Sequence, residues 1–170
     1  MQRKECHKLD EIEHPQEVAL RVMRDLITWN AEPPQVVRER FPEAAFGLAG
    51  VEAYASACER SDVNEDWVAC HDINGQWTIR NSTNVYLKRV AEAGVLAQDV
   101  NAHLPSAAKG YSAAYKSWQK LYEKHLGHGV PEEKRKTKEH RLAGAAAVRE
   151  GLEHEKAALA EVEQALTLLA

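Results

Sequence analysis

Long hydrophobic runs are missing from this 170-residue chain, and so is an excess of charge of one sign. No stretch approaches the roughly 18 to 20 apolar residues of a membrane span, so we expect no membrane partner. The formal net charge is −4, whereas a nucleic-acid binder carries a basic stripe, so no nucleic-acid partner is predicted. A basic run at residues 134–138 follows Glu132 and Glu133 and is typical of a solvated helix surface.

Cysteine is also scarce. The three cysteines, Cys6, Cys58 and Cys70, are an odd number without C-x-x-C spacing, which gives no disulfide framework and suits a reduced, cytoplasmic protein. Residues 1–14 lack the apolar segment of a secretory signal, and we expect them to form a loosely ordered arm. The remaining length is enough to bury a core without covalent staples, so residues 1–170 are interpreted as a single domain.

The sequence shows no alternating pattern typical of β-strands and no internal repeat, and its prolines and glycines separate helical segments. Pro15, Pro105 and Pro131 stand where a first-turn proline belongs. The fold class predicted is therefore all-α: a single-domain bundle of about five helices with a long C-terminal helix. The expected segments are residues 15–30, 43–59, a helix from 62 or 64 to about 97, a helix from 105 that stops at 127–129, and residues 131 to about 170.

Apolar residues repeat along the last predicted helix at heptad spacing. Leu152, Leu159 and Leu166 form one series; Val148, Val162 and Leu169 form the second, which Glu155 alone interrupts. Gly144 and Gly151 predict tight helix crossings. A helix of about 35 residues would run roughly 52 Å and project past the shorter helices, which favours a homodimer that covers the seam. A break at either glycine, or a missing covering domain, are the alternatives.

One stretch differs from the rest of the chain. Residues 67–87 carry only two charged side chains, Asp72 and Arg80, yet contain many His, Asn, Gln, Ser, Thr and Trp residues. Polar groups on such a helix need enclosed partners. Helical spacing places eight residues of the stretch on one face: Trp67, Cys70, His71, Asn74, Trp77, Thr78, Asn81 and Val85. Arg80 and Leu87 fall on a different side of the predicted helix.

This polar stretch has two interpretations. It lines a pocket, with the two indoles supplying stacking surface and the polar side chains orienting a small molecule; the candidate ligand-binding residues are Trp67, His71, Asn74, Trp77, Arg80 and Asn81. Alternatively, it forms a buried hydrogen-bond network between helices, with Arg80 reaching a carboxylate on a neighbour and the tryptophans in the core.

Catalytic and metal motifs are sparse. Cys70 and His71 are adjacent, and adjacent helical side chains diverge by about 100°, so they are poorly placed as nucleophile and base. Cys58 could approach His71 only if their helices pack. The histidines include a His125-x-x-His128 pair, together with His7, His14, His140 and His154, but no complete ligand set, so no metal or cofactor is predicted.

Three segments of the chain resemble a known family: GLAGVEAYA at 47–55; Trp67 with Arg80 and Tyr86–Leu87; and AKGYSAAYKSW at 108–118. They resemble the C-terminal helical region of butirosin biosynthesis protein H-like proteins, and an alanine-rich final helix fits that resemblance. Members join this region to an N-terminal papain-like acyltransferase or peptidase-like domain. That domain and its catalytic cysteine have no counterpart here, so the resemblance implies a helical domain without catalytic residues.

The function expected from the sequence is a non-catalytic helical domain that binds a small molecule or a partner protein through the polar and aromatic helix face. The first alternative is an enzyme or enzyme subunit with His71 as general base, assisted by Cys70 or Asp72. The second is a structural module that dimerises through the leucine seam of the last helix.

Overall fold

The computed structural model describes residues 13–32, 34–60 and 73–169, without the side chains of Ile73 and Asn74. Every regular element within these ranges is helical, which confirms the predicted all-α class. The elements are α1 Pro15–Ala31, α2 Gln35–Arg40, α3 Gly47–Glu59, α5 Ile73–Ala93, α6 Gln98–Asn101, α7 Leu104–Leu121, the π-helix η2 Tyr122–Leu126, α8 Glu132–Arg135 and α9 Lys138–Thr167. Among them, no helix is long and apolar enough to cross a membrane.

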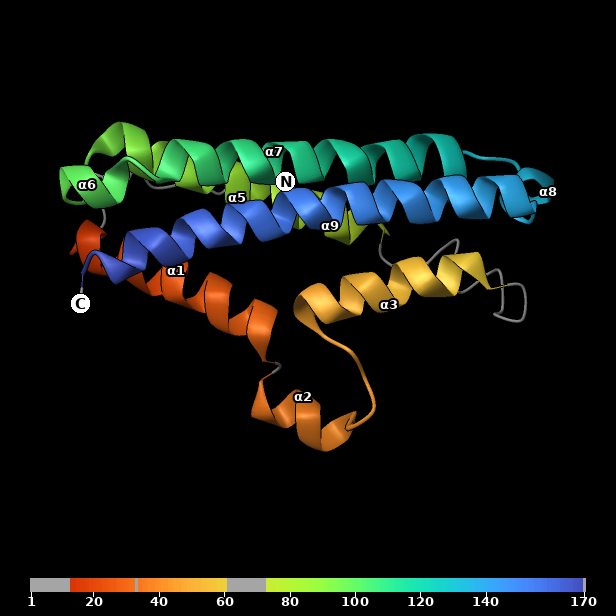
Figure 1. Ribbon diagram of the computed structural model, residues 1–170, viewed down its shortest axis with the longest axis horizontal. Coiled ribbons are helices and arrows are strands. Elements are labelled where there is room, and N and C mark those ends of the chain that lie inside the picture. The colour runs from red at the N-terminus through yellow and green to blue at the C-terminus, as the bar shows by residue number, and fades with distance from the viewer. Residues whose placement is uncertain (1–12, 33, 61–72, 170) are drawn as a thin grey trace, which may run out of the picture.

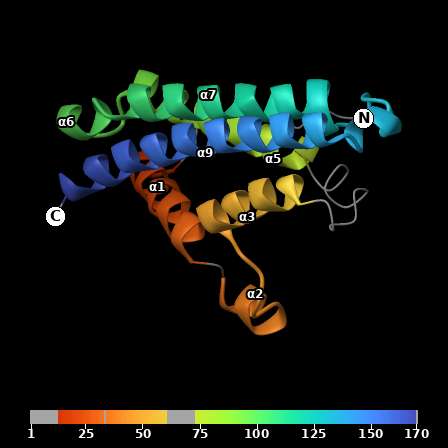
Figure 2. The ribbon, with the colours of Figure 1, turned by 45° about the vertical axis from the view of Figure 1, so that its right-hand side comes forward.

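The three longest helices form the body of the molecule. Helices α7 and α9 run side by side along the long axis, and α5 packs on α7 behind them (Figure 1). Helices α1 and α3 both pack on α9 on its other side, and α2 extends away from the body where the chain passes from α1 to α3 (Figure 2). Helix α3 is thus held by α9, whereas α5 is held by α7.

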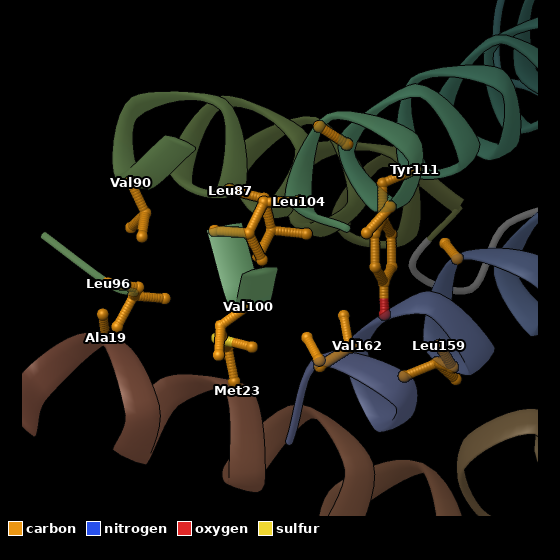
Figure 3. Close-up of a cluster of buried hydrophobic side chains, with 14 residues drawn as sticks. Ala19, Met23, Leu87, Val90, Leu96, Val100, Leu104, Tyr111, Leu159 and Val162 are labelled. Atoms are coloured by element: carbon orange, nitrogen blue, oxygen red, sulfur yellow. The ribbon is translucent and has the colours of Figure 1, made fainter. Parts of the chain in front are cut away.

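The core consists of two clusters of buried side chains. The first joins α1, α5, α6, α7 and α9, where Met23, Leu87, Val100 and Val162 meet (Figure 3). The second joins α3, α7, η2 and α9, and its buried members include Cys58, Trp118, Leu121, Leu126, Val148 and Leu152. Burying each large aliphatic side chain contributes about 1.5–3 kcal/mol, so both clusters fix the positions of the helices around α9.

Two helix ends differ from the sequence prediction. Helix α3 begins at Gly47 rather than near Glu43, because the φ of +56° at Gly47 interrupts the right-handed helical conformation. Glycine is needed at this position, since a side chain there would overlap the carbonyl oxygen of Asn30. Helix α5 ends at Ala93 rather than near Ala97, because Gly94 follows in the left-handed conformation with a φ of +60°. The start predicted for that helix, at Asp62 or Asn64, lies outside the described residues.

The predicted fifth helix is two helices. Helix α8 ends at Arg135, and Thr137 caps α9 by accepting a hydrogen bond from the backbone N–H of His140 at 3.3 Å. Helix α9 then runs without a break for 30 residues, about 45 Å, so the predicted alternative of a break at Gly144 or Gly151 is wrong. The tight crossings are confirmed, since an added Cβ would lie 2.8 Å from Leu126 at Gly144 and 3.3 Å from Ser117 at Gly151.

The apolar seam of α9 is covered by the chain itself over most of its length. Leu152 and Leu159 are buried against neighbouring helices, and Leu166 is half-buried. Only the end of the seam is open, where Leu169 is 40% exposed. The seam therefore does not project past the bundle, which removes the reason for expecting a homodimer; the dimer itself remains a prediction.

Candidate functional site

Helix α5 faces the core with a different side from the one predicted. Arg80 is buried at 4% exposure and Leu87 at 0%, whereas Thr78, Asn81 and Val85 lie on the exposed side. Arg80 and Leu87 lie on a different side of the helix from these three residues, as predicted, but it is the side of Arg80 and Leu87 that is buried. Packing decides the orientation, because the methylene stem of an arginine and a leucine side chain remove more apolar surface from water than threonine or asparagine.

The structure describes the side chains of three of the six predicted ligand-binding residues. Trp67, His71 and the side chain of Asn74 lie outside the described part of the chain, as do Cys70 and Asp72 of the alternative catalytic interpretation. Asn81 is exposed and does not line the cavity described below, so its assignment as a ligand-binding residue stays a prediction. Trp77 and Arg80 both point into the bundle, but they have different neighbours.

Trp77 belongs to an aromatic stack that joins α5 to α7 and to the first residue of η2. Its ring stacks on Tyr115 at 5.6 Å between centroids and on Tyr122 at 5.8 Å, with interplanar angles of 4° and 12°. Such pairs contribute about 0.5–1.5 kcal/mol each beyond the area that they bury. Trp77 is therefore a packing residue at the α5–α7 contact, as the network interpretation expected for the tryptophans.

Arg80 forms an ion pair with Glu155 of α9. Its Nε donates to Glu155 Oε2 at 2.9 Å, and its Nη2 contacts the same oxygen at 2.6 Å. Its Nη1 donates to the backbone oxygen of Gln76 at 3.0 Å and to Gln76 Oε1 at 2.8 Å, one helical turn earlier. This confirms the predicted contact between Arg80 and a carboxylate of a neighbouring helix, and it explains why Glu155 interrupts the apolar series of α9.

Aromatic side chains enclose this ion pair. The guanidinium of Arg80 lies over the ring of Trp118, 4.7 Å from its centroid, and Tyr54 of α3 stacks on Trp118 at 5.9 Å. Burial raises the pKa of Glu155, and the positive charge of Arg80 opposes that rise. Burial also raises the pKa of the Tyr111 phenol, and the Glu155 charge raises it further, so Tyr111 is a neutral donor at physiological pH.

A cavity of about 900 Å³ opens beside the ion pair, between α3 and α5. Its inner wall includes Arg80, Glu155, Tyr111 and Trp118. The remaining lining comes from α1, the chain before α3, α3 itself and α5: Leu26, Trp29, Asn30, Ala44, Ala45, Phe46, Gly47, Gly50, Val51, Ala53, Tyr54, Ser56, Ala57, Arg60, Gln76, Ile79 and Thr83. The small residues of α3 leave this space open. Ala55, on the same helix, is buried in the second cluster between α3 and α9.

Two inner-wall groups carry unused hydrogen-bonding capacity. The hydroxyl of Tyr111 and the indole N–H of Trp118 are buried and have no hydrogen-bond partner among the residues that the structure describes. An unsatisfied buried donor costs about 1–3 kcal/mol, and native structures leave few of them. At the other end of the cavity, Trp29 and Ile79 are apolar lining residues that remain 63% and 57% exposed.

Neither nucleophilic nor metal chemistry gains support from the described residues. Burial raises the pKa of the Cys58 thiol to about 11, so this cysteine stays protonated and is a poor nucleophile. His125 lies 5.8 Å from His140 between ring centroids, whereas His128, its partner in the predicted spacing, is exposed. Within the described ranges there is no group of three or more His, Cys, Asp and Glu residues that could hold a metal ion.

No family model, curated protein or solved structure matches this chain. The resemblance to the helical region of butirosin biosynthesis protein H-like proteins therefore remains a prediction. Tyr111, Trp118 and Glu155 were not predicted from the sequence as members of the site. Glu155 carried a signal, because it was the one charged residue in an otherwise apolar heptad series.

Proposed function

We propose that this protein is a non-catalytic helical domain that binds a small molecule in the cavity between α3 and α5. The observation that carries the proposal is the buried ion pair of Arg80 and Glu155 in the cavity wall. A buried ion pair contributes little net stability, and well-packed apolar residues often replace one without loss. Charged groups in the wall of a largely apolar cavity orient polar ligands, and this supports a binding role for the pair.

A small molecule fits this site better than a partner protein. The buried polar side chains of the lining are Arg80 and Glu155, and the cavity volume of about 900 Å³ falls within the range of roughly 300–1,000 Å³ that is typical of ligand pockets. The two alternatives from the sequence lack such support. The catalytic one depends on His71, which lies outside the described residues, and the dimerisation one depends on a seam whose leucines are largely buried.

The test uses a leucine substitution in the cavity lining. Ala53→Leu places a larger side chain at an exposed position of α3 that lines the cavity, and Ala49→Leu places the same side chain at an exposed position of the same helix outside the lining. A metabolite library is screened by thermal shift, because a ligand of the native state raises the melting temperature. We expect compounds that stabilise the natural protein and Ala49→Leu but not Ala53→Leu. Stabilisation that survives equally in Ala53→Leu would contradict the proposed site.

Oligomeric state is tested separately by light scattering after size exclusion. A mass near the 19.0 kDa of the chain over a wide concentration range would show that the seam serves only the chain's own core. A concentration-dependent rise towards twice this mass would support the dimerisation alternative.

A further inference from the structure

The two charges at the inner end of the cavity balance each other. Arg80 and Glu155 sit together at the inner end, and the other charged lining residue, Arg60, is exposed at the end of α3. The rest of the lining is apolar or uncharged. A net charge brought to the inner end would lose its hydration without gaining a counter-ion, which is strongly unfavourable. The inner end is therefore suited to an uncharged group.

The hydrogen bonds that Arg80 and Glu155 already make limit what this uncharged group can be. An arginine has five N–H donors, and three of those on Arg80 donate in hydrogen bonds: one from Nε and two from Nη1. Nη2 contacts Glu155 Oε2 at 2.6 Å in the ion pair, which occupies one side of this nitrogen. The second N–H of Nη2 has no acceptor among the described residues. Both contacts to Glu155 fall on Oε2, and no described residue donates to Oε1. The ion pair thus keeps one donor and one acceptor for a ligand.

We infer that the ligand is an uncharged molecule carrying an amide or lactam on an aromatic or aliphatic ring system. This inference rests on the proposed small-molecule function. The amide carbonyl accepts from the remaining N–H of Arg80, and the amide N–H donates to Glu155 Oε1. Both bonds are charge-assisted and are stronger than bonds between neutral groups.

The ring system of the proposed ligand would bind in the apolar part of the cavity. Trp29 and Ile79 are exposed lining residues that a ring would cover, and Ala53 and Gly50 leave room for it on the α3 side. Removing the indole and isoleucine surface from water supplies the hydrophobic contribution to binding.

The test is a series of probes that share one ring and differ in one group. 1-Naphthaleneacetamide is compared with the anionic 1-naphthaleneacetate, the cationic 2-(1-naphthyl)ethylamine and methyl 1-naphthaleneacetate, which keeps the carbonyl but has no N–H. Dissociation constants are measured by ligand-observed NMR with the full chain. We expect the amide to bind about tenfold or more tightly than the other three, the ester included, because the ester leaves Glu155 Oε1 without a donor. Ala53→Leu should abolish this binding and Ala49→Leu should preserve it.

A change of charge provides a second readout. Glu155→Gln leaves Arg80 without its counter-ion, so the acid should gain affinity relative to the amide. Glu153→Gln on the exposed side of α9 should leave the order unchanged. Equal binding of ester and amide, preferred binding of the acid or the amine by the natural protein, or binding of no probe would each overturn the amide inference. The proposed function has its own test: it is contradicted if the metabolite screen yields no compound that stabilises the natural protein but not Ala53→Leu.

Discussion

Arg80 and Glu155 are 75 positions apart in the chain, yet two nitrogens of the Arg80 guanidinium converge on one oxygen of Glu155, at 2.9 and 2.6 Å. The pair links α5 to α9, whereas α5 otherwise packs on α7. It therefore fixes the wall of the cavity as well as the position of α5.

The first prediction concerns this pair. Arg80→Met and Glu155→Leu should each lower the free energy of unfolding by about 3–5 kcal/mol, because each leaves one buried charge without its partner. The double variant Arg80→Met/Glu155→Leu should lose clearly less than the sum, since no charge remains buried. Urea unfolding of the four proteins gives the coupling energy. Strictly additive losses would mean that the pair is not an energetic unit.

The second prediction tests the role of Trp77. Trp77→Leu should cost about 1–3 kcal/mol of stability, because it removes two stacked pairs with Tyr115 and Tyr122. It should leave the affinity of a cavity ligand within about twofold, since Trp77 is not part of the lining. Asn81→Ala, an exposed change one turn further on, should stay within about 0.5 kcal/mol. A loss of ligand affinity in Trp77→Leu without a loss of stability would restore the predicted pocket role.

The sequence predicted the all-α class because prolines and glycines mark helix ends directly. It could not predict which side of α5 faces inward. Polar residues surround that helix on several sides, and the choice depends on partners in other helices: Trp118 and Glu155 for Arg80, and Tyr115 for Trp77. The one visible signal was Glu155, the single charged residue in its apolar heptad series, whereas Arg80 is one of only two charged residues in the polar stretch.

The break between α8 and α9 was also missed. The predicted helix from Pro131 placed Thr137 in its interior, but a threonine caps a helix readily when its side chain can accept a backbone N–H bond. The basic run around it lies on a solvated surface, as predicted, and Lys136 pairs there with Glu132 at 2.6 Å.

The third prediction tests the crossing of α7 and α9 at Gly110. A Cβ at Gly110 would lie 2.7 Å from the Cβ of Ala158 and 3.0 Å from the backbone oxygen of His154, so one helix must move. Gly110→Ala should lower stability by about 1–3 kcal/mol, although alanine is the better helix former by about 1 kcal/mol. Gly129→Ala, in a turn where nothing lies within 4 Å of an added Cβ, is the control for the substitution itself and should be nearly neutral. A gain of stability in Gly110→Ala, measured by urea unfolding, would show that the contact between α7 and α9 has room for a methyl group.

The last prediction concerns pH. The pKa of His125 is lowered from its usual value of 6.5, mainly by burial and also by the positive charges of His140, Lys120 and Lys124. The unfolded chain therefore binds a proton at a pH where the folded protein does not, so the stability from this group is complete above about pH 6.5 and is lost as the pH falls towards the folded-state pKa. His125→Gln should flatten this decline, and Lys124→Gln should reduce it by removing one of the repelling charges. Lys109→Gln, an exposed change on α7 at a residue that does not perturb His125, should keep the natural slope. Urea unfolding at a series of pH values measures the slopes, and an unchanged decline in His125→Gln would assign the acid sensitivity to other groups.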